Sequence, residues 1–224
     1  MKFLQVKRVP TLFWSSSKAL TVRPRPLSLF MLVVGLFLFG LGEALLVAAG
    51  VGVSPWTVFA EGVTQQTGWS LGFATFIISV CVLILWIPLK RTPGIGTILN
   101  VLIIAAVLEY VLPYLPTANG YFLQSMQALA GVLVTGLGGA IYLIANLGPG
   151  PRDGLMTGLQ AITSLPIAQV RGGLEVSVVL IGWLLGGTAG LGTVLFAFGI
   201  GPALALGLHT LGSVFSQRVS IDRR

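Results

Sequence analysis

Residues 148–154 (GPGPRDG) place a basic and an acidic side chain next to each other in a chain with few charges. Arg152 and Asp153 stand there, although only 8% of the 224 residues are charged. A guanidinium binds anionic groups well, and a neighbouring carboxylate can orient it or accept a hydrogen bond. The glycines and prolines around them predict a break between helices. We therefore expect a substrate- or ion-binding pair, with a loop anchor and helix cap as the alternative.

Three further charged residues are candidates because of where they stand. Glu43 lies well inside an apolar run, and an ionisable group in such a run marks a functional position. It would relay a proton or bind a cation, or else stay neutral and hydrogen-bonded to a neighbouring helix. Arg171 and Glu175 are four residues apart and predict an ion pair on one helix face. That pair is either structural or a gate and partner for Arg152.

A related stretch, residues 52–58 (GVSPWTV), stands 96 residues earlier in the same setting. Paired broken elements in an apolar chain are typical of transporter sites. Gly150, Gly154 and Gly158 recur every four residues, which is typical of close helix packing. Lining of a substrate path is the alternative for these glycines. The complete candidate substrate-binding set is Arg152, Asp153, Glu43, Trp56, Pro55, Gly52, Gly148, Gly150 and Gly154.

Other kinds of site have little support in the residues. Cys81 and His209 are the only cysteine and histidine, so we expect neither a disulfide nor a metal site. The glycine-rich run 150–158 is followed by no Gly-Lys-Ser/Thr, which argues against a phosphate-binding loop. We expect no cofactor and no covalent catalysis, and a membrane enzyme ranks third among the functions considered.

The composition indicates an integral membrane protein. Hydrophobic residues make up 55% of the chain, and its charged fraction is about a third of the roughly 25% usual in soluble domains. The net charge of +7 does not point to nucleic acid, because basic residues gather at the two ends of the chain. Basic ends beside apolar segments are typical of cytoplasmic flanks.

The apolar pattern predicts six membrane spans with two shorter, more polar pieces between them. The spans are expected at residues 27–49, 71–89, 97–115, 125–145, 169–185 and 193–211, the last interrupted by Gly199, Gly201 and Pro202. The short pieces, 56–68 and 155–164, are re-entrant or interfacial. The chain then divides into a basic tail (1–26), two three-span regions (27–116 and 125–211) and a second basic tail (212–224).

The first tail is expected to be flexible or to lie on the membrane surface, with apolar side chains in the headgroup layer. These side chains are Phe3, Leu4, Leu12, Phe13 and Trp14. The distribution of lysine and arginine predicts that both termini are cytoplasmic.

A shift of 96 residues aligns the chain with itself without a gap. Residues 40–109 share 19 identities with residues 136–205, six of them glycines. Three spans in each half would invert the second half relative to the first. The sequence therefore predicts an all-α transmembrane protein of about six helices, built as two inverted three-helix repeats. Each repeat holds one broken half-helix segment, and the site is expected between the two breaks.

Three motifs carry a resemblance to a known family. They are residues 50–56 (GVGVSPW), 90–97 (KRTPGIGT) and 148–158 (GPGPRDGLMTG). Together they resemble the YczE/YyaS/YitT family of bacterial integral membrane proteins, over about residues 28–211. Thr57 departs from the acidic residue expected there, so the first break lacks the carboxylate that Asp153 supplies in the second. The resemblance implies a bacterial inner-membrane protein and specifies no substrate.

The expected function is transport of a small solute, with the lipid bilayer and an unidentified solute as partners. Homo-oligomer formation is left open. The alternative is a non-transporting accessory protein that assists a membrane-associated enzyme or biosynthetic complex. A transporter would have a polar cavity between the two breaks, whereas an accessory protein would have a dry core and a polar cytoplasmic face.

Overall fold

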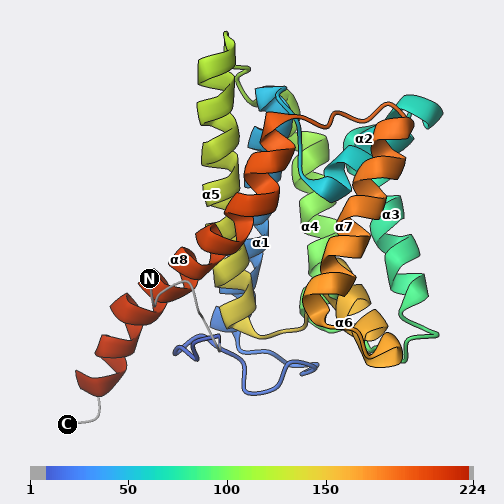
Figure 1. Cartoon of the computed structure of the whole chain (residues 1–224). Coiled ribbons are helices and arrows are strands. Elements are labelled where there is room, and N and C mark those ends of the chain that lie inside the picture. The colour runs from blue at the N-terminus through green and yellow to red at the C-terminus, as the bar shows by residue number, and fades with distance from the viewer. Residues whose placement is uncertain (1–8, 222–224) are drawn as a thin grey trace.

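The computed structural model describes the backbone of residues 9–221 and the side chains of residues 9–215, and the regular secondary structure of this part is all helical (Figure 1). The helices are α1 (Pro26–Ala49), α2 (Pro55–Thr67), α3 (Leu71–Leu85), α4 (Ile95–Tyr110), the 3-10 turn η2 (Leu112–Tyr114), α5 (Tyr121–Ala145), α6 (Pro151–Thr163), α7 (Ile167–Leu184) and α8 (Leu191–Ile221). In this described part, five helices are long and apolar enough to cross a membrane. The bent pair α2–α3 makes a sixth span if it is counted as one. The prediction of an all-α membrane protein with about six spans is confirmed.

Helix boundaries in the second half repeat those of the first half at an offset of 96 residues. The ends of α1 and α5, both ends of α2 and α6, and the starts of α3 and α7 and of α4 and α8 all differ by that number. Backbone contacts recur in the same way. The amide of Gly96 donates to the carbonyl of Leu147 at 2.7 Å, and the amide of Gly192 donates to that of Val51 at 2.8 Å. The inverted orientation of the halves stays a prediction.

The body is organised around α1 and α5, which pack closely along glycine faces. A side chain at Gly35 or Gly138 would collide with the facing backbone. Gly42 lies against Thr135 in the same way. Small residues allow such close approach between membrane helices. Helix α4 packs on α1, α8 packs on α5, α2 packs on α7, and α6 packs on α3.

The two short helices start in the interior and run toward opposite edges of the body (Figure 1). The C-terminal part of α2 packs against the end of α7, where the side-chain amide of Gln66 donates to the backbone carbonyl of Leu185. The C-terminal part of α6 packs against the turn after α3, where Arg91 donates to the carbonyl of Thr157. The first piece matches its predicted bounds within one residue. The second starts at Pro151 and not at residue 155, because proline is well suited to the first helical position.

The N-terminal segment is partly packed against the body: residues 12, 14 and 16 are buried, whereas most of residues 17–25 are exposed. Trp14 is 1% exposed and Leu12 is 5% exposed, and they belong to one hydrophobic cluster with Ala140, Ile144 and Leu208 of α5 and α8. The amide of Ser16 donates to the carbonyl of Ala145 at 3.0 Å. The expectation that Leu12 and Trp14 lie in the headgroup layer is wrong, whereas Phe13 is 50% exposed. Phe3 and Leu4 lie outside the described residues.

Helix α8 continues beyond the predicted span. It runs through Gly199, Gly201 and Pro202 without a break and reaches Ile221, inside the region predicted as a tail. Proline is tolerated inside membrane helices, because neighbouring groups can satisfy the freed backbone carbonyl. The interruption expected at these residues is therefore wrong.

Candidate functional site

Two helix N-termini meet in the interior of the body. Glycines with positive φ, Gly52 at 108° and Gly148 at 116°, turn the chain before α2 and before α6. Each helix then starts with a proline, Pro55 or Pro151, and neither start is capped by its own N-cap side chain. The unpaired N–H groups of a first helical turn carry partial positive charge. Two such ends point into the same region.

The first turns of α2 and α6 are in direct contact through Trp56 and Arg152. The guanidinium carbon of Arg152 lies 5.3 Å from the centroid of the Trp56 ring, which is cation–π distance. These residues are also equivalent under the 96-residue shift. In the described part of the chain, Arg152 forms no salt bridge. Its positive charge is therefore held next to an aromatic face.

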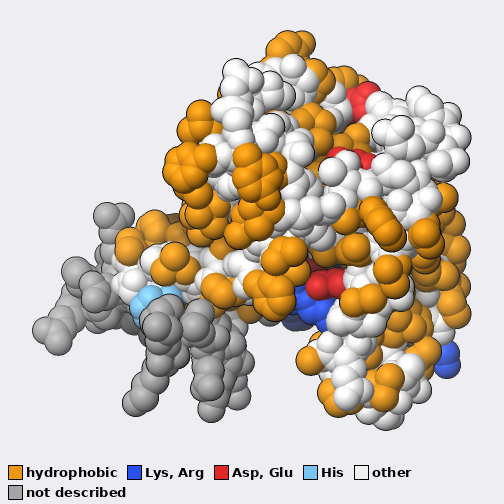
Figure 2. Space-filling view, turned by 45° about the horizontal axis from the view of Figure 1, so that its top comes forward, with side chains coloured by type: hydrophobic (Ala, Val, Ile, Leu, Met, Phe, Trp, Pro, Cys, Tyr) orange, Lys and Arg blue, Asp and Glu red, His pale blue; other side chains and the backbone are white. Residues whose placement is uncertain are grey.

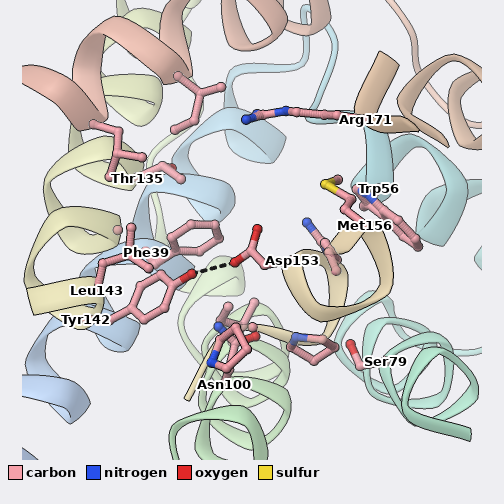
Figure 3. Close-up of a pocket in the computed structure, with 18 of the residues that line it drawn as sticks. Phe39, Trp56, Ser79, Asn100, Thr135, Tyr142, Leu143, Asp153, Met156 and Arg171 are labelled. Carbon is pink, nitrogen blue, oxygen red and sulfur yellow. Dashed lines mark hydrogen bonds between the residues drawn. The ribbon is translucent and has the colours of Figure 1, made fainter. Parts of the chain in front are cut away.

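A cavity of about 260 Å³ lies beside this contact (Figure 3). Its polar lining comes from five helices and the loop before α6: Thr75, Ser79, Asn100, Thr135, Tyr142, Gly150, Arg152, Asp153, Arg171 and Glu175. Its apolar lining includes Phe39, Trp56, Ile104, Leu143, Met156, Phe196, Ile200 and Leu204. The cavity thus combines a few charged groups with apolar walls, as small-molecule sites commonly do.

Asp153 is held in place by a tyrosine of α5. The hydroxyl of Tyr142 donates to Oδ2 of Asp153 at 2.7 Å, and Figure 3 shows this bond crossing one side of the cavity. Tyr142 is 6% exposed, whereas Asp153 is exposed within the cavity. Asp153 is the third residue of α6, so it also stands where a negative charge favours the helix dipole.

Arg171 and Glu175 form the predicted ion pair, and both line the cavity. Nε of Arg171 lies 2.8 Å from Oε1 of Glu175. Arg171 extends from α7 across the cavity (Figure 3). The Arg171 side chain is 49% exposed, so this pair contributes little to stability by itself.

Two buried donors near the cavity have no hydrogen-bond partner among the described residues. They are Nε1 of Trp56 and Oγ1 of Thr75. The exposed fractions of these residues are 7% and 4%. Buried donors without a partner are uncommon in folded proteins.

Glu43 belongs to α1 and lies outside the cavity lining. Its side chain reaches the start of α2. Its Oε2 accepts from Ser54 at 2.6 Å and from Thr57 at 2.8 Å. It is 1% exposed, and its Oε1 has no partner in the described part of the chain. The first break therefore does have a carboxylate, supplied by α1 and not by residue 57. This corrects the expectation that the first break lacks one.

Most of the candidate glycines serve packing. A side chain at Gly52 would meet the backbone of Gly190, and one at Gly148 would meet that of Gly94. Gly154 lies against the ring of Trp86. Of the nine predicted substrate-binding residues, the cavity is lined by Arg152, Asp153, Trp56 and Gly150. Glu43, Pro55, Gly52, Gly148 and Gly154 lie around it.

Sequence reasoning missed several residues at this site. Tyr142, Asn100 and Thr75 line the cavity, and Ser54 and Thr57 bind Glu43. One signal was available, because each is a polar residue within or beside an apolar run. The sequence does not show which face of each helix points inward, so it could not indicate that these residues lie close together.

The long apolar helices around a small cavity with a few charged groups define an integral membrane protein. The chain belongs to a family of unknown function (DUF6198), which it matches over residues 27–208. It is 40% identical over 207 residues to an uncharacterized protein of Haemophilus influenzae, covering 92% of this chain and 94% of the relative. It is 31% identical over 176 residues to the uncharacterized membrane protein YczE of Bacillus subtilis, covering 78% of this chain and 82% of the relative. No solved structure matches. The resemblance to a YczE-like family is confirmed.

Proposed function

We propose that this protein transports a small solute across the bacterial inner membrane, with both termini cytoplasmic. Two three-helix halves of opposite orientation would enclose the binding site between their helix breaks. The observation that carries the proposal is the contact between the first turns of α2 and α6 beside a cavity that holds four charged side chains between apolar walls. Half-helices that start at the middle of a membrane are a recurring way to build a transporter site.

Arg152 is the residue proposed to hold an anionic group of the solute. It lines the cavity, and its charge has no salt-bridge partner among residues 9–215. The N-termini of α2 and α6 add positive potential in the same place. Asp153, fixed by Tyr142, orients Arg152 or accepts a hydrogen bond from the solute. Arg171 faces the same cavity from α7.

Glu43 is proposed to couple a proton or a cation to transport. It is buried at the start of α2, bound through one carboxylate oxygen to Ser54 and Thr57. A change in its protonation would alter these two bonds and so the position of the first turn of α2. Trp56, which contacts Arg152, lies in that turn. Glu43 can thus act on the site without touching the solute.

An accessory role and an enzymatic role receive less support. An accessory protein needs no polar cavity between the two breaks, whereas this cavity is lined by four charged side chains. We propose that the protein is not an enzyme, since its histidine, His209, lies outside the cavity lining.

Access to the cavity from both sides of the membrane tests transport. Asn100→Cys, in a Cys81→Ser background, places a thiol in the cavity lining. A membrane-impermeant maleimide is applied to right-side-out cells and to inside-out vesicles. A transporter exposes its site alternately, so we expect labelling in both preparations.

Lys90→Cys is the control, because this exposed residue in the turn before α4 should be labelled only in inside-out vesicles. Labelling of Asn100→Cys from one side only would overturn the transport proposal and favour the accessory role. The Arg152→Ala variant should insert into the membrane normally. It should lose two-sided labelling of residue 100, or solute uptake when measured in proteoliposomes.

A further inference from the structure

The cavity wall is incomplete between α7 and α8. Helix α7 packs on α2 and α8 packs on α5, but α7 and α8 do not pack on each other. Their 96-residue equivalents, α3 and α4, do form a packed pair. Both α7 and α8 nevertheless line the cavity, through Arg171, Glu175, Phe196, Ile200 and Leu204. The opening therefore faces sideways, where α7 and α8 would border lipid.

Charged side chains are reached through this opening. Figure 2 shows acidic and basic side chains together in a hollow between hydrophobic walls. Arg171 has 49% of its side chain exposed, and Glu175 has 23%. Charged groups that face hydrocarbon are costly unless a polar partner covers them. A purely apolar lipid tail cannot serve as that partner.

The charges of the cavity favour a guest that carries both signs. The lining holds two cationic and two anionic side chains, Arg152 and Arg171 with Asp153 and Glu175. Arg171 and Glu175 pair with each other, but Arg152 and Asp153 form no salt bridge with one another. Only Oδ2 of Asp153 has a partner, Tyr142. A net-neutral guest with an anionic and a cationic group matches this arrangement in a low-dielectric site.

The size of the cavity limits how much of a guest it can enclose. About 260 Å³ lies below the range of roughly 300–1,000 Å³ typical of drug-sized ligand sites. A polar headgroup fits this volume, and acyl chains do not. The gap between α7 and α8 leaves a path for the chains to remain in the bilayer.

From these observations we propose that the cavity binds the headgroup of a zwitterionic amphiphile that enters sideways between α7 and α8. The phosphate would lie at Arg152, with the donors of Trp56 and Thr75 close by, and a primary ammonium would lie at Asp153. The acyl chains would lie in the gap between α7 and α8, beside the partly exposed Ile200 of α8. This inference rests on the proposed transport function and specifies its substrate class.

Photo-crosslinking in nanodiscs tests the proposal. The full chain is placed in phosphatidylcholine discs with a small fraction of diazirine-tailed phosphatidylethanolamine, phosphatidylglycerol or phosphatidylcholine. Crosslinks are mapped by peptide mass spectrometry. We expect phosphatidylethanolamine to label the 196–204 segment of α8 at least fivefold more than the other two lipids, after normalisation to the exposed face of α5.

Two variants separate the contributions of the two charges. Arg152→Gln should reduce this labelling at least fivefold. Asp153→Asn should lower the labelling by phosphatidylethanolamine to that by phosphatidylcholine. Arg23→Gln, an exposed arginine before α1, should change nothing. Arg152→Lys should restore part of the labelling, which keeps the test valid if the glutamine variant folds poorly.

Soluble phosphoethanolamine carries the same headgroup, so millimolar concentrations should compete and reduce labelling by phosphatidylethanolamine. If the three lipids label equally, the lateral lipid inference is overturned. Two-sided thiol access at residue 100 can still succeed in that case, so transport of a water-soluble solute would stand. If lipid labelling succeeds and two-sided access fails, transport is overturned and lipid binding remains.

Discussion

At the scale of single residues, Glu43 connects the buried start of α2 to α1. Its Oε2 accepts from both Ser54 and Thr57, whose hydroxyls are also 2.9 Å apart. Glutamine keeps an acceptor oxygen there, whereas leucine leaves the two hydroxyls with only each other. We expect Glu43→Leu to destabilise the protein by about 1–3 kcal/mol and Glu43→Gln by less. Thermal unfolding in detergent measures both, and equal losses would contradict the hydrogen-bond role.

Tyr142 makes a second buried hydrogen bond that can be removed without changing the shape of the side chain. Tyr142→Phe deletes the donor to Asp153 and leaves the ring. A hydrogen bond to a charged group contributes about 1.5–3 kcal/mol, so we expect a loss in that range. Tyr110→Phe is the control, because Tyr110 is 72% exposed. Equal unfolding temperatures for the two variants would show that the bond contributes nothing.

The Arg171–Glu175 pair is expected to matter for the site and little for stability. Where water reaches a pair four residues apart on a helix, the pair contributes about 0.3–0.5 kcal/mol. A double-mutant cycle with Arg171→Ala and Glu175→Ala should therefore give a coupling below about 1 kcal/mol. A coupling above about 2 kcal/mol would mean that the pair is shielded from solvent, for instance by a partner over the gap between α7 and α8.

At the scale of helices, two glycines inside helices have opposite surroundings. A side chain on Gly154 of α6 would collide with the ring of Trp86, which donates to the carbonyl of Pro151 at 3.0 Å. Gly201 of α8 has open space. We expect Gly154→Ala to cost about 1–3 kcal/mol through overpacking. Gly201→Ala should be neutral or stabilising by up to about 1 kcal/mol. Reversed signs in thermal unfolding would refute the packing of α6 on Trp86.

Helix periods and turns could be predicted from the sequence because they depend on local residue types. Apolar runs of about 20 residues gave the spans, and Gly-Pro clusters located both short helices. Residues 152 and 153 were placed in a break because glycine and proline surround them. In the structure, Pro151 starts α6, so both residues belong to its first turn.

Contacts between distant segments could not be predicted in the same way. Trp14 is buried only because α5 and α8 together offer it a surface. Glu43 reaches Ser54 and Thr57 because the chain reverses after α1, at Gly50 and Gly52. Nothing in the spacing of Tyr142 and Asp153 indicates that they meet. Such contacts depend on helix faces and crossing geometry, which apolar sequences specify weakly.

At the scale of the whole molecule, the repeated helix boundaries leave the relative orientation of the halves to be measured. Thr67 and Thr163 are a matched pair for this purpose. They are 96 residues apart, both are exposed at the ends of α2 and α6, and each hydroxyl bonds to the carbonyl four residues earlier. Cysteine at either position, in a Cys81→Ser background, should therefore have a similar intrinsic reactivity.

An inverted pair predicts labelling from opposite sides of the membrane. With cytoplasmic termini, Thr67→Cys should react with an impermeant maleimide in intact cells, and Thr163→Cys only in inside-out vesicles. The reason is that α2 runs from the interior to one edge of the body and α6 runs to the other (Figure 1). Labelling of both cysteines from one side would refute the inverted arrangement. Opposite labelling with the sides exchanged would preserve the inversion and reverse the topology assigned from the basic residues.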